Sequence, residues 1–111
     1  MKYTVYYTET AERDVEDTAR YIMLSLKNPV AADQLLIEVD KAVNSLAHMP
    51  ERYRLVDDLV LASWGIRFVQ VKNYLAFYTI SPQTATVHII RFLYGRSDWA
   101  FILRSSYIPE A

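Results

Sequence analysis

Apolar residues change their spacing about half-way along the chain. Up to about residue 60 they recur mainly at steps of three or four, which is the period of one helix face. Beyond that point they alternate with polar residues or form short runs, as strands do. The pattern therefore predicts a helical part followed by a sheet.

One strand and one helix begin the chain. The segment Tyr3–Tyr7 is β-branched and aromatic, which suits a half-buried strand. Thr8 and Thr10 then offer side-chain oxygens for a helix N-cap. The first helix runs from there towards Asn28-Pro29, and its apolar face consists of Ala11, Val15, Ala19, Ile22 and Leu26.

A second helix starts where the first one breaks. Asn28 is a suitable N-cap, and Pro29 suits the first helical position because the N–H that it lacks would have no partner there. The apolar stripe of this helix consists of Ala32, Leu35, Leu36, Val39, Val43 and Leu46. The short joint predicts an antiparallel helical hairpin over Thr10–Ala47, packed on one face of the sheet.

Three strand-like runs and a final helix complete the predicted fold. The runs are Gly65–Val71, Tyr74–Ile80 and Ala85–Tyr94. Ser97 is expected to cap a short helix over Asp98–Arg104. The result is an α+β fold of order β-α-α-β-β-β, with a helical hairpin on one face of a four-stranded sheet and a short C-terminal helix.

Composition limits the class of protein. The 111 residues predict a single domain over residues 1–111, and an apolar share of 52% is enough for a core. The chain has no cysteine, which excludes disulfides and thiolate chemistry. The N-terminal residues lack the pattern of a signal peptide, and no apolar stretch is long enough to span a membrane. We therefore expect a cytoplasmic protein without a membrane partner.

The charges are unevenly distributed. The net charge of −1 argues weakly against a nucleic-acid-binding protein, since such proteins are usually basic. Residues 1–50 hold five lysines and arginines against eight acidic residues, and residues 51–111 hold seven against five. The net charge of the whole chain thus hides an acidic first half and a mildly basic second half.

The predicted sheet carries well-separated cations and few acids. Arg67 lies in the first of the three runs, Arg91 lies near the end of the third, and Tyr94 and Arg96 follow it. Asp98 is the only acidic residue between Val60 and Arg104. Because planar guanidinium groups bind phosphate through two hydrogen bonds, the sheet is a candidate surface for a phosphodiester.

Two further arginines precede the sheet. Arg52 and Arg54 lie in the segment Glu51–Ala62, which we interpret as a connector, and they are placed to flank the same site. The alternative is that they pair locally with Asp57 and Asp58 as ordinary surface residues.

Motifs for cofactors or metals are missing from the sequence. The chain has two glycines, which leaves no glycine-rich phosphate loop, and it has no His-Glu-x-x-His pattern. His48 and His88 have no neighbour in the sequence that makes them a ligand or a base, so we interpret both as structural. We expect neither a cofactor nor a metal ion.

In its order of elements, the chain resembles the RelE/ParE toxin superfamily of bacterial toxin–antitoxin systems. The resemblance covers nearly the whole chain and is carried by Asp14 through Tyr21-Ile22, Pro29 with Ala31-Ala32, Leu46 to Met49-Pro50, Gly65-Ile66-Arg67, Asn73-Tyr74 with Tyr78, and the run Ile89–Trp99. It implies a mostly antiparallel sheet with both long helices on one face. It also implies a cognate antitoxin that wraps the toxin in a hetero-oligomer.

Two activities occur in this superfamily. The RelE-like branch cuts messenger RNA in the ribosomal A site, and the ParE-like branch poisons DNA gyrase and is not a nuclease. By resemblance to the RelE-like branch, Arg67, Arg91 and Tyr94 are the candidate catalytic residues, and the candidate RNA-binding residues are Arg52, Arg54 and Arg96. The chain departs from that branch because it is not strongly basic and has Tyr94 where many relatives have histidine.

The sequence favours the ribonuclease, with the ribosome and messenger RNA as partners, over the gyrase inhibitor. Cleavage without a metal uses the 2′-hydroxyl as nucleophile and gives a cyclic phosphate, so cations must stabilise the phosphorane. Arg67 and Arg91 would supply that charge, and the ribosome would orient the RNA. In the gyrase alternative both arginines are structural, and Arg67 holds the end of the sheet to a carboxylate or to backbone carbonyls.

Overall fold

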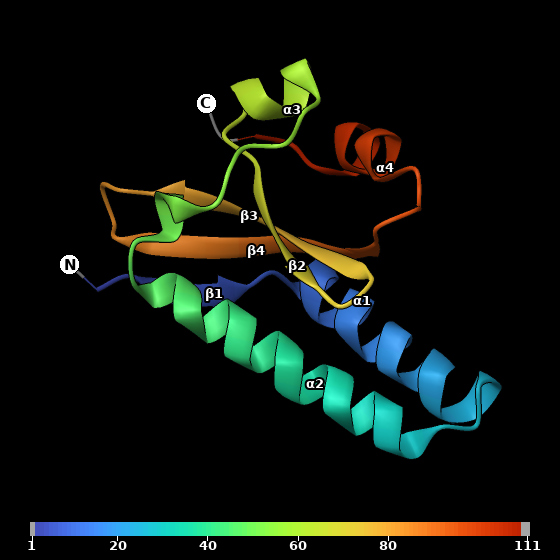
Figure 1. Cartoon of the computed structure of the whole chain (residues 1–111). Coiled ribbons are helices and arrows are strands. Elements are labelled where there is room, and N and C mark those ends of the chain that lie inside the picture. The colour runs from blue at the N-terminus through green and yellow to red at the C-terminus, as the bar shows by residue number, and fades with distance from the viewer. Residues whose placement is uncertain (1, 110–111) are drawn as a thin grey trace.

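The computed structural model describes residues 2–109. Figure 1 shows a four-stranded sheet between two layers of helices. The elements along the chain are β1 (Thr4–Tyr7), α1 (Glu9–Arg20), the π-helix η1 (Tyr21–Ser25), α2 (Pro29–Asn44), the 3-10 turns η2 (Ser45–Ala47) and η3 (Pro50–Arg52), α3 (Leu59–Ser63), β2 (Arg67–Val71), β3 (Tyr74–Ser81), β4 (Thr86–Tyr94) and α4 (Trp99–Ser106). Within residues 2–109, no helix combines the length and the apolar character that crossing a bilayer requires.

The sheet has the strand order β1-β4-β3-β2. Strand β1 runs parallel to β4, and the other two pairs are antiparallel, which confirms a mostly antiparallel sheet. Between β3 and β4 the register shifts at one point: Phe77 lies opposite Arg91, but Tyr78 lies opposite Ile89. Ile90 is therefore an extra residue on β4, and this bulge lies directly beside Arg91.

The predicted helical hairpin is confirmed. Thr8 caps α1 by accepting a hydrogen bond from the Ala11 amide at 3.1 Å, and Asn28 caps α2 by accepting one from the Ala31 amide at 3.1 Å. Helices α1 and α2 lie on the same side of the sheet (Figure 1). The core between them and the strands includes Ala11, Val15, Ile22, Leu35, Val39, Val43, Leu46, Tyr78, Ile89 and Phe92. The first helix ends in the π-helical turn η1, which the spacing of apolar residues does not predict.

The opposite face of the sheet is covered as well, which the sequence did not predict. Helices α3 and α4 lie there (Figure 1), over a second core formed by Val56, Leu61, Ile66, Phe77, Ile90 and Leu103. The segment interpreted as a connector thus contains a helix, α3, whose N-cap is Asp58. With five residues, α3 is too short to show a helical period.

The C-terminal helix differs in detail from its prediction. It spans Trp99–Ser106, and its N-cap is Asp98, which accepts a hydrogen bond from the Phe101 amide at 3.4 Å. The predicted cap, Ser97, is wrong. Its hydroxyl donates to the Tyr94 carbonyl at 2.6 Å and thereby stabilises the turn before the helix.

Candidate functional site

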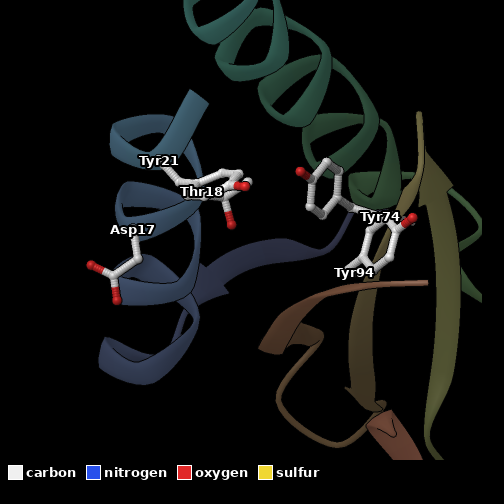
Figure 2. A pocket seen from close by; sticks show the side chains of 5 residues that line it. All are labelled: Asp17, Thr18, Tyr21, Tyr74 and Tyr94. Carbon is white, nitrogen blue, oxygen red and sulfur yellow. The ribbon is translucent and has the colours of Figure 1, made fainter. Parts of the chain in front are cut away.

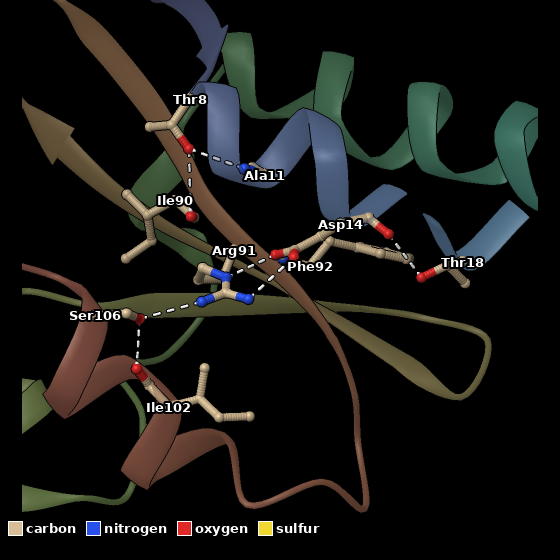
Figure 3. Close-up of polar contacts among 9 residues, drawn as sticks. All are labelled: Thr8, Ala11, Asp14, Thr18, Ile90, Arg91, Phe92, Ile102 and Ser106. Carbon is tan, nitrogen blue, oxygen red and sulfur yellow. Dashed lines mark hydrogen bonds and ion pairs between the residues drawn. The ribbon is translucent and has the colours of Figure 1, made fainter. Parts of the chain in front are cut away.

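Arg91 is held by a carboxylate of the first helix. Its Nε lies 2.7 Å from Oδ2 of Asp14 and its Nη2 lies 3.0 Å from Oδ1, so the two planar groups face each other with two hydrogen bonds (Figure 3). The side chains are 18% and 14% exposed. A pair of this geometry, largely removed from water, has strong mutual attraction and leaves neither charge free for a ligand.

The same pair joins three elements of the fold. Oδ2 of Asp14 accepts a hydrogen bond from the Phe92 amide of β4 at 3.0 Å, and Nη1 of Arg91 donates to the Ser106 hydroxyl of α4 at 3.1 Å (Figure 3). Strand β1 ends at Tyr7, so within residues 2–109 the edge of β4 opposite β3 has no neighbouring strand beyond Ile89. The carboxylate of Asp14 therefore satisfies a backbone donor that the sheet leaves open.

Arg67 binds backbone carbonyls. Its Nη1 donates to the Tyr53 carbonyl at 2.6 Å and to the Glu51 carbonyl at 3.2 Å. Opposite it on β3, the hydroxyl of the buried Tyr78 donates to the Pro50 carbonyl at 2.6 Å. Carbonyl contacts of this kind are what the structural alternative for Arg67 predicted. The segment before α3 is thus fastened to the sheet by side chains of β2 and β3.

Burial dominates the titration of Tyr78. It raises the pKa of the phenol from 10.0 to about 12, although the cations of Arg67 and Arg52 act in the opposite direction. A folded-state pKa above the unfolded value means that the stabilisation by this group is complete below about pH 10 and is lost as the pH rises through about 12.

We expect Tyr78→Phe to lower the free energy of unfolding at neutral pH by about 1–3 kcal/mol, because the Pro50 carbonyl loses its buried donor. The same change should make the loss of stability above pH 10 shallower. The substitution should not abolish this loss of stability, since burial and Asp40 raise the pKa of Tyr7 to about 12 as well. Urea unfolding at a series of pH values measures both effects, with Tyr6→Phe on the exposed ring of β1 as control. An alkaline slope identical to that of the unchanged protein would contradict this account.

The two arginines of the connector also have partners within the chain. Arg52 donates from Nη1 to the His48 carbonyl at 2.6 Å and from Nη2 to the Ser45 hydroxyl at 2.8 Å, and so caps the C-terminal end of the second helix. Arg54 pairs with Asp57 at 2.8 Å, which confirms local pairing for that residue. The expected pairing of Asp58 is wrong, because its carboxylate lies 2.8 Å from Nη2 of Arg104.

Tyr94 lies among other tyrosines. Its ring is 45% exposed and meets the ring of Tyr74 edge-on, with centroids 5.8 Å apart. Both rings line a hollow of 390 Å³ whose other walls are Tyr21, Thr18 and Asp17 of the first helical segment (Figure 2).

The three candidate catalytic residues are not brought together. In the strand register, Arg67 lies opposite Tyr78, which belongs to the first core, and Arg91 lies opposite Phe77, which belongs to the second core. Residues opposite each other in an antiparallel pair point to the same face, so the side chains of the two arginines leave opposite faces of the sheet. Tyr94 pairs with Tyr74, which places it four residues of β3, or about 13 Å, from Arg67 along the strand.

Arg96 is exposed in the loop after β4, and within residues 2–109 it has no hydrogen-bonded or ionic side-chain partner. No group of three metal-binding side chains occurs among these residues either.

Comparison with known families identifies the chain. The sequence pattern of the family described as "ParE toxin of type II toxin-antitoxin system, parDE" matches residues 5–99. The chain belongs to this ParE toxin family. It is therefore the toxin of a type II toxin–antitoxin system within the RelE/ParE superfamily. No curated protein matches it in sequence.

Solved structures share the fold of this ParE-family toxin. A chain of the chromosomal ParDE system from P. aeruginosa superimposes with a TM-score of 0.65 at 16% identity, covering 84% of this chain and 96% of its own. The RelBE2 complex from Mycobacterium tuberculosis gives 0.57 at 23% identity, covering 85% and 92%. The archaeal RelE-RelB complex from Pyrococcus horikoshii OT3 gives 0.51 at 13%, covering 87% and 100%.

Sequence reasoning on this ParE-family toxin missed the role of Asp14. An arginine placed in an apolar strand needs a counter-ion, which can be a carboxylate of the protein as well as a phosphate. Asp14 lies between Ala11 and Val15, which are buried positions of the first helix, and it is thus close to the core side. That position, together with the embedded Arg91, was the available signal.

Proposed function

We propose that this toxin acts in the ParE-like way, as a poison of DNA gyrase that works by binding protein and does not cut RNA. The observation that carries the proposal is the ion pair in which Asp14 holds the guanidinium of Arg91. The match of residues 5–99 to the ParE toxin family supports the same branch.

Cleavage of RNA without a metal needs cations that are free to meet the phosphorane. The guanidinium of Arg91 already faces a carboxylate with two hydrogen bonds, and that of Arg67 faces carbonyl oxygens. To bind a phosphate, Arg91 would have to leave Asp14 and expose an unpaired, largely buried carboxylate, which is costly. A ribosome-dependent nuclease with Arg67, Arg91 and Tyr94 at its centre stays a prediction, and this arrangement of charges favours the alternative.

The toxin is further proposed to be held inactive in the cytoplasm by a cognate antitoxin. The three solved relatives described above come from a ParDE system and from two RelBE complexes, and this chain has their fold. The antitoxin would bind through one or more of the exposed surfaces that the toxin leaves uncovered.

A reconstituted gyrase reaction tests the proposal. Purified toxin is added to DNA gyrase, ATP and relaxed plasmid, and both supercoiling and the linear DNA released by denaturing the enzyme are measured. We expect supercoiling to fall and linear DNA to accumulate only when gyrase is present. Relaxation of the supercoiled form of this plasmid by topoisomerase I is the control and should be unaffected. Normal supercoiling with the toxin in molar excess would contradict the proposal.

A further inference from the structure

Three tyrosines from separate elements line one hollow on the surface of the toxin. Tyr21 comes from η1, Tyr74 from the start of β3 and Tyr94 from the end of β4, and with Asp17 and Thr18 they line the 390 Å³ hollow (Figure 2). We name this hollow the tyrosine groove. Tyr21 is 56% exposed and Tyr94 45%, so two large aromatic side chains face solvent at one place. Aromatic rings exposed together in a concave site are typical of binding surfaces.

Two of the three rings in the tyrosine groove are packed against neighbouring aromatic rings. The ring of Tyr74 stacks on the core residue Phe92 at a centroid distance of 5.2 Å, and Tyr94 rests edge-on against Tyr74. Burial, followed by the neighbouring phenols of Tyr94 and Tyr21, raises the pKa of Tyr74. A groove whose rings are already positioned loses little conformational entropy when a ligand enters.

The described lining of the groove contains no basic side chain. Among residues 2–109, Asp17 is the only charged residue in its lining, and its carboxylate points away from Tyr74 and Tyr94 (Figure 2). Helix α1, which forms one wall, carries five acidic residues against two arginines. One of the five, Asp14, is neutralised by Arg91, and Asp17 has a long contact of 3.3 Å with Arg20 in an exposed position. A phosphate-bearing ligand would find no guanidinium or ammonium group in this lining to bind it.

Aromatic faces carry negative partial charge and attract cations placed over them. A groove with three phenol rings and no basic side chain in its described lining therefore fits a cationic side chain better than a nucleotide. The planar guanidinium of arginine also stacks on tyrosine, and its N–H groups can donate to phenol oxygens.

We propose that the tyrosine groove binds an arginine or lysine side chain of the antitoxin. This inference rests on the proposed function, because it takes the antitoxin as the partner. It assigns to Tyr21, Tyr74 and Tyr94 a shared role in binding protein, and it gives Tyr94 no part in proton transfer.

The test compares two substitutions of the most exposed ring. The antitoxin encoded beside the toxin gene is titrated into toxin carrying Tyr21→Phe, which keeps the ring, or Tyr21→Leu, which removes it. We expect Tyr21→Phe to bind nearly as the unchanged toxin does, and Tyr21→Leu to bind about five- to thirtyfold more weakly. Tyr6→Leu, on an exposed ring of β1 outside the groove, is the matched control and should leave the affinity unchanged.

A double-mutant cycle then locates the occupant. Each arginine and lysine of the antitoxin is replaced by methionine, and we expect one of these changes to be non-additive with Tyr21→Leu. Equal affinities for the phenylalanine and leucine variants, or additivity at every cation, would overturn the inference. So would a Tyr21→Leu effect confined to binding of single-stranded RNA or of gyrase. If the unchanged toxin does not bind the antitoxin, the proposed partner is itself wrong, which separates that failure from failure of the groove alone.

Discussion

Replacing Asp14 by alanine is expected to lower the free energy of unfolding by about 3–5 kcal/mol, because it leaves the largely buried guanidinium of Arg91 without its counter-ion. The Phe92 amide loses its acceptor in the same step. Urea unfolding followed by circular dichroism measures the change. The control is Glu9→Ala, which removes an exposed pair with Arg13 and should cost no more than about 0.5 kcal/mol. Similar values for the two variants would contradict a structural role for the Asp14–Arg91 pair.

A paired substitution separates structure from chemistry at the same place. Asp14→Leu combined with Arg91→Met replaces both charges by apolar side chains, and we expect it to be more stable than either single variant, since no unpaired charge remains. The folded double variant should still inhibit supercoiling by gyrase. Recovery of stability without recovery of toxicity would instead indicate that the guanidinium acts on a ligand.

Replacing Phe77 by alanine is expected to destabilise the protein by about 3–5 kcal/mol, because its fully buried ring fills the centre of the second core. The ring lies 5.3 Å from that of Trp99, at the start of α4. We expect amide hydrogen exchange in α3 and α4 to increase more than exchange in α1 and α2, which pack on the other face. Phe101→Ala, on the exposed side of α4, is the control and should change little. Uniform acceleration over all helices would contradict the division into two cores.

Most of the fold could be predicted because its signals are local. Thr8, Asn28 and Pro29 mark the helix starts within a few residues of the groups that they cap, and long apolar stripes identify the hairpin. Helix α3 and the π-helical turn η1 have five residues each and are therefore shorter than the window in which a period becomes visible. Helix α3, one part of the cover on the second face of the sheet, was missed for that reason, whereas the other part, α4, was predicted as a helix without a place on the sheet.

The candidate site could not be predicted because its partners are far apart in the sequence. Asp14 and Arg91 are separated by 77 positions, so no local pattern relates them. An arginine in a strand fits a phosphate site and an internal ion pair equally well, and only the tertiary structure distinguishes the two. The tyrosine groove depends likewise on three separate elements, because η1, the start of β3 and the end of β4 each contribute one of its tyrosines.

Ribosomes programmed with a defined messenger test most directly whether the toxin leaves messenger RNA intact, as we propose. Purified toxin is added to ribosomes with a filled P site and an empty A site, and primer extension maps the ends of the messenger. An active ribosome-dependent nuclease of the superfamily serves as the positive control. We expect full-length messenger at toxin concentrations that stop gyrase. A cut within the A-site codon would contradict this expectation and would return Arg67, Arg91 and Tyr94 to a catalytic role.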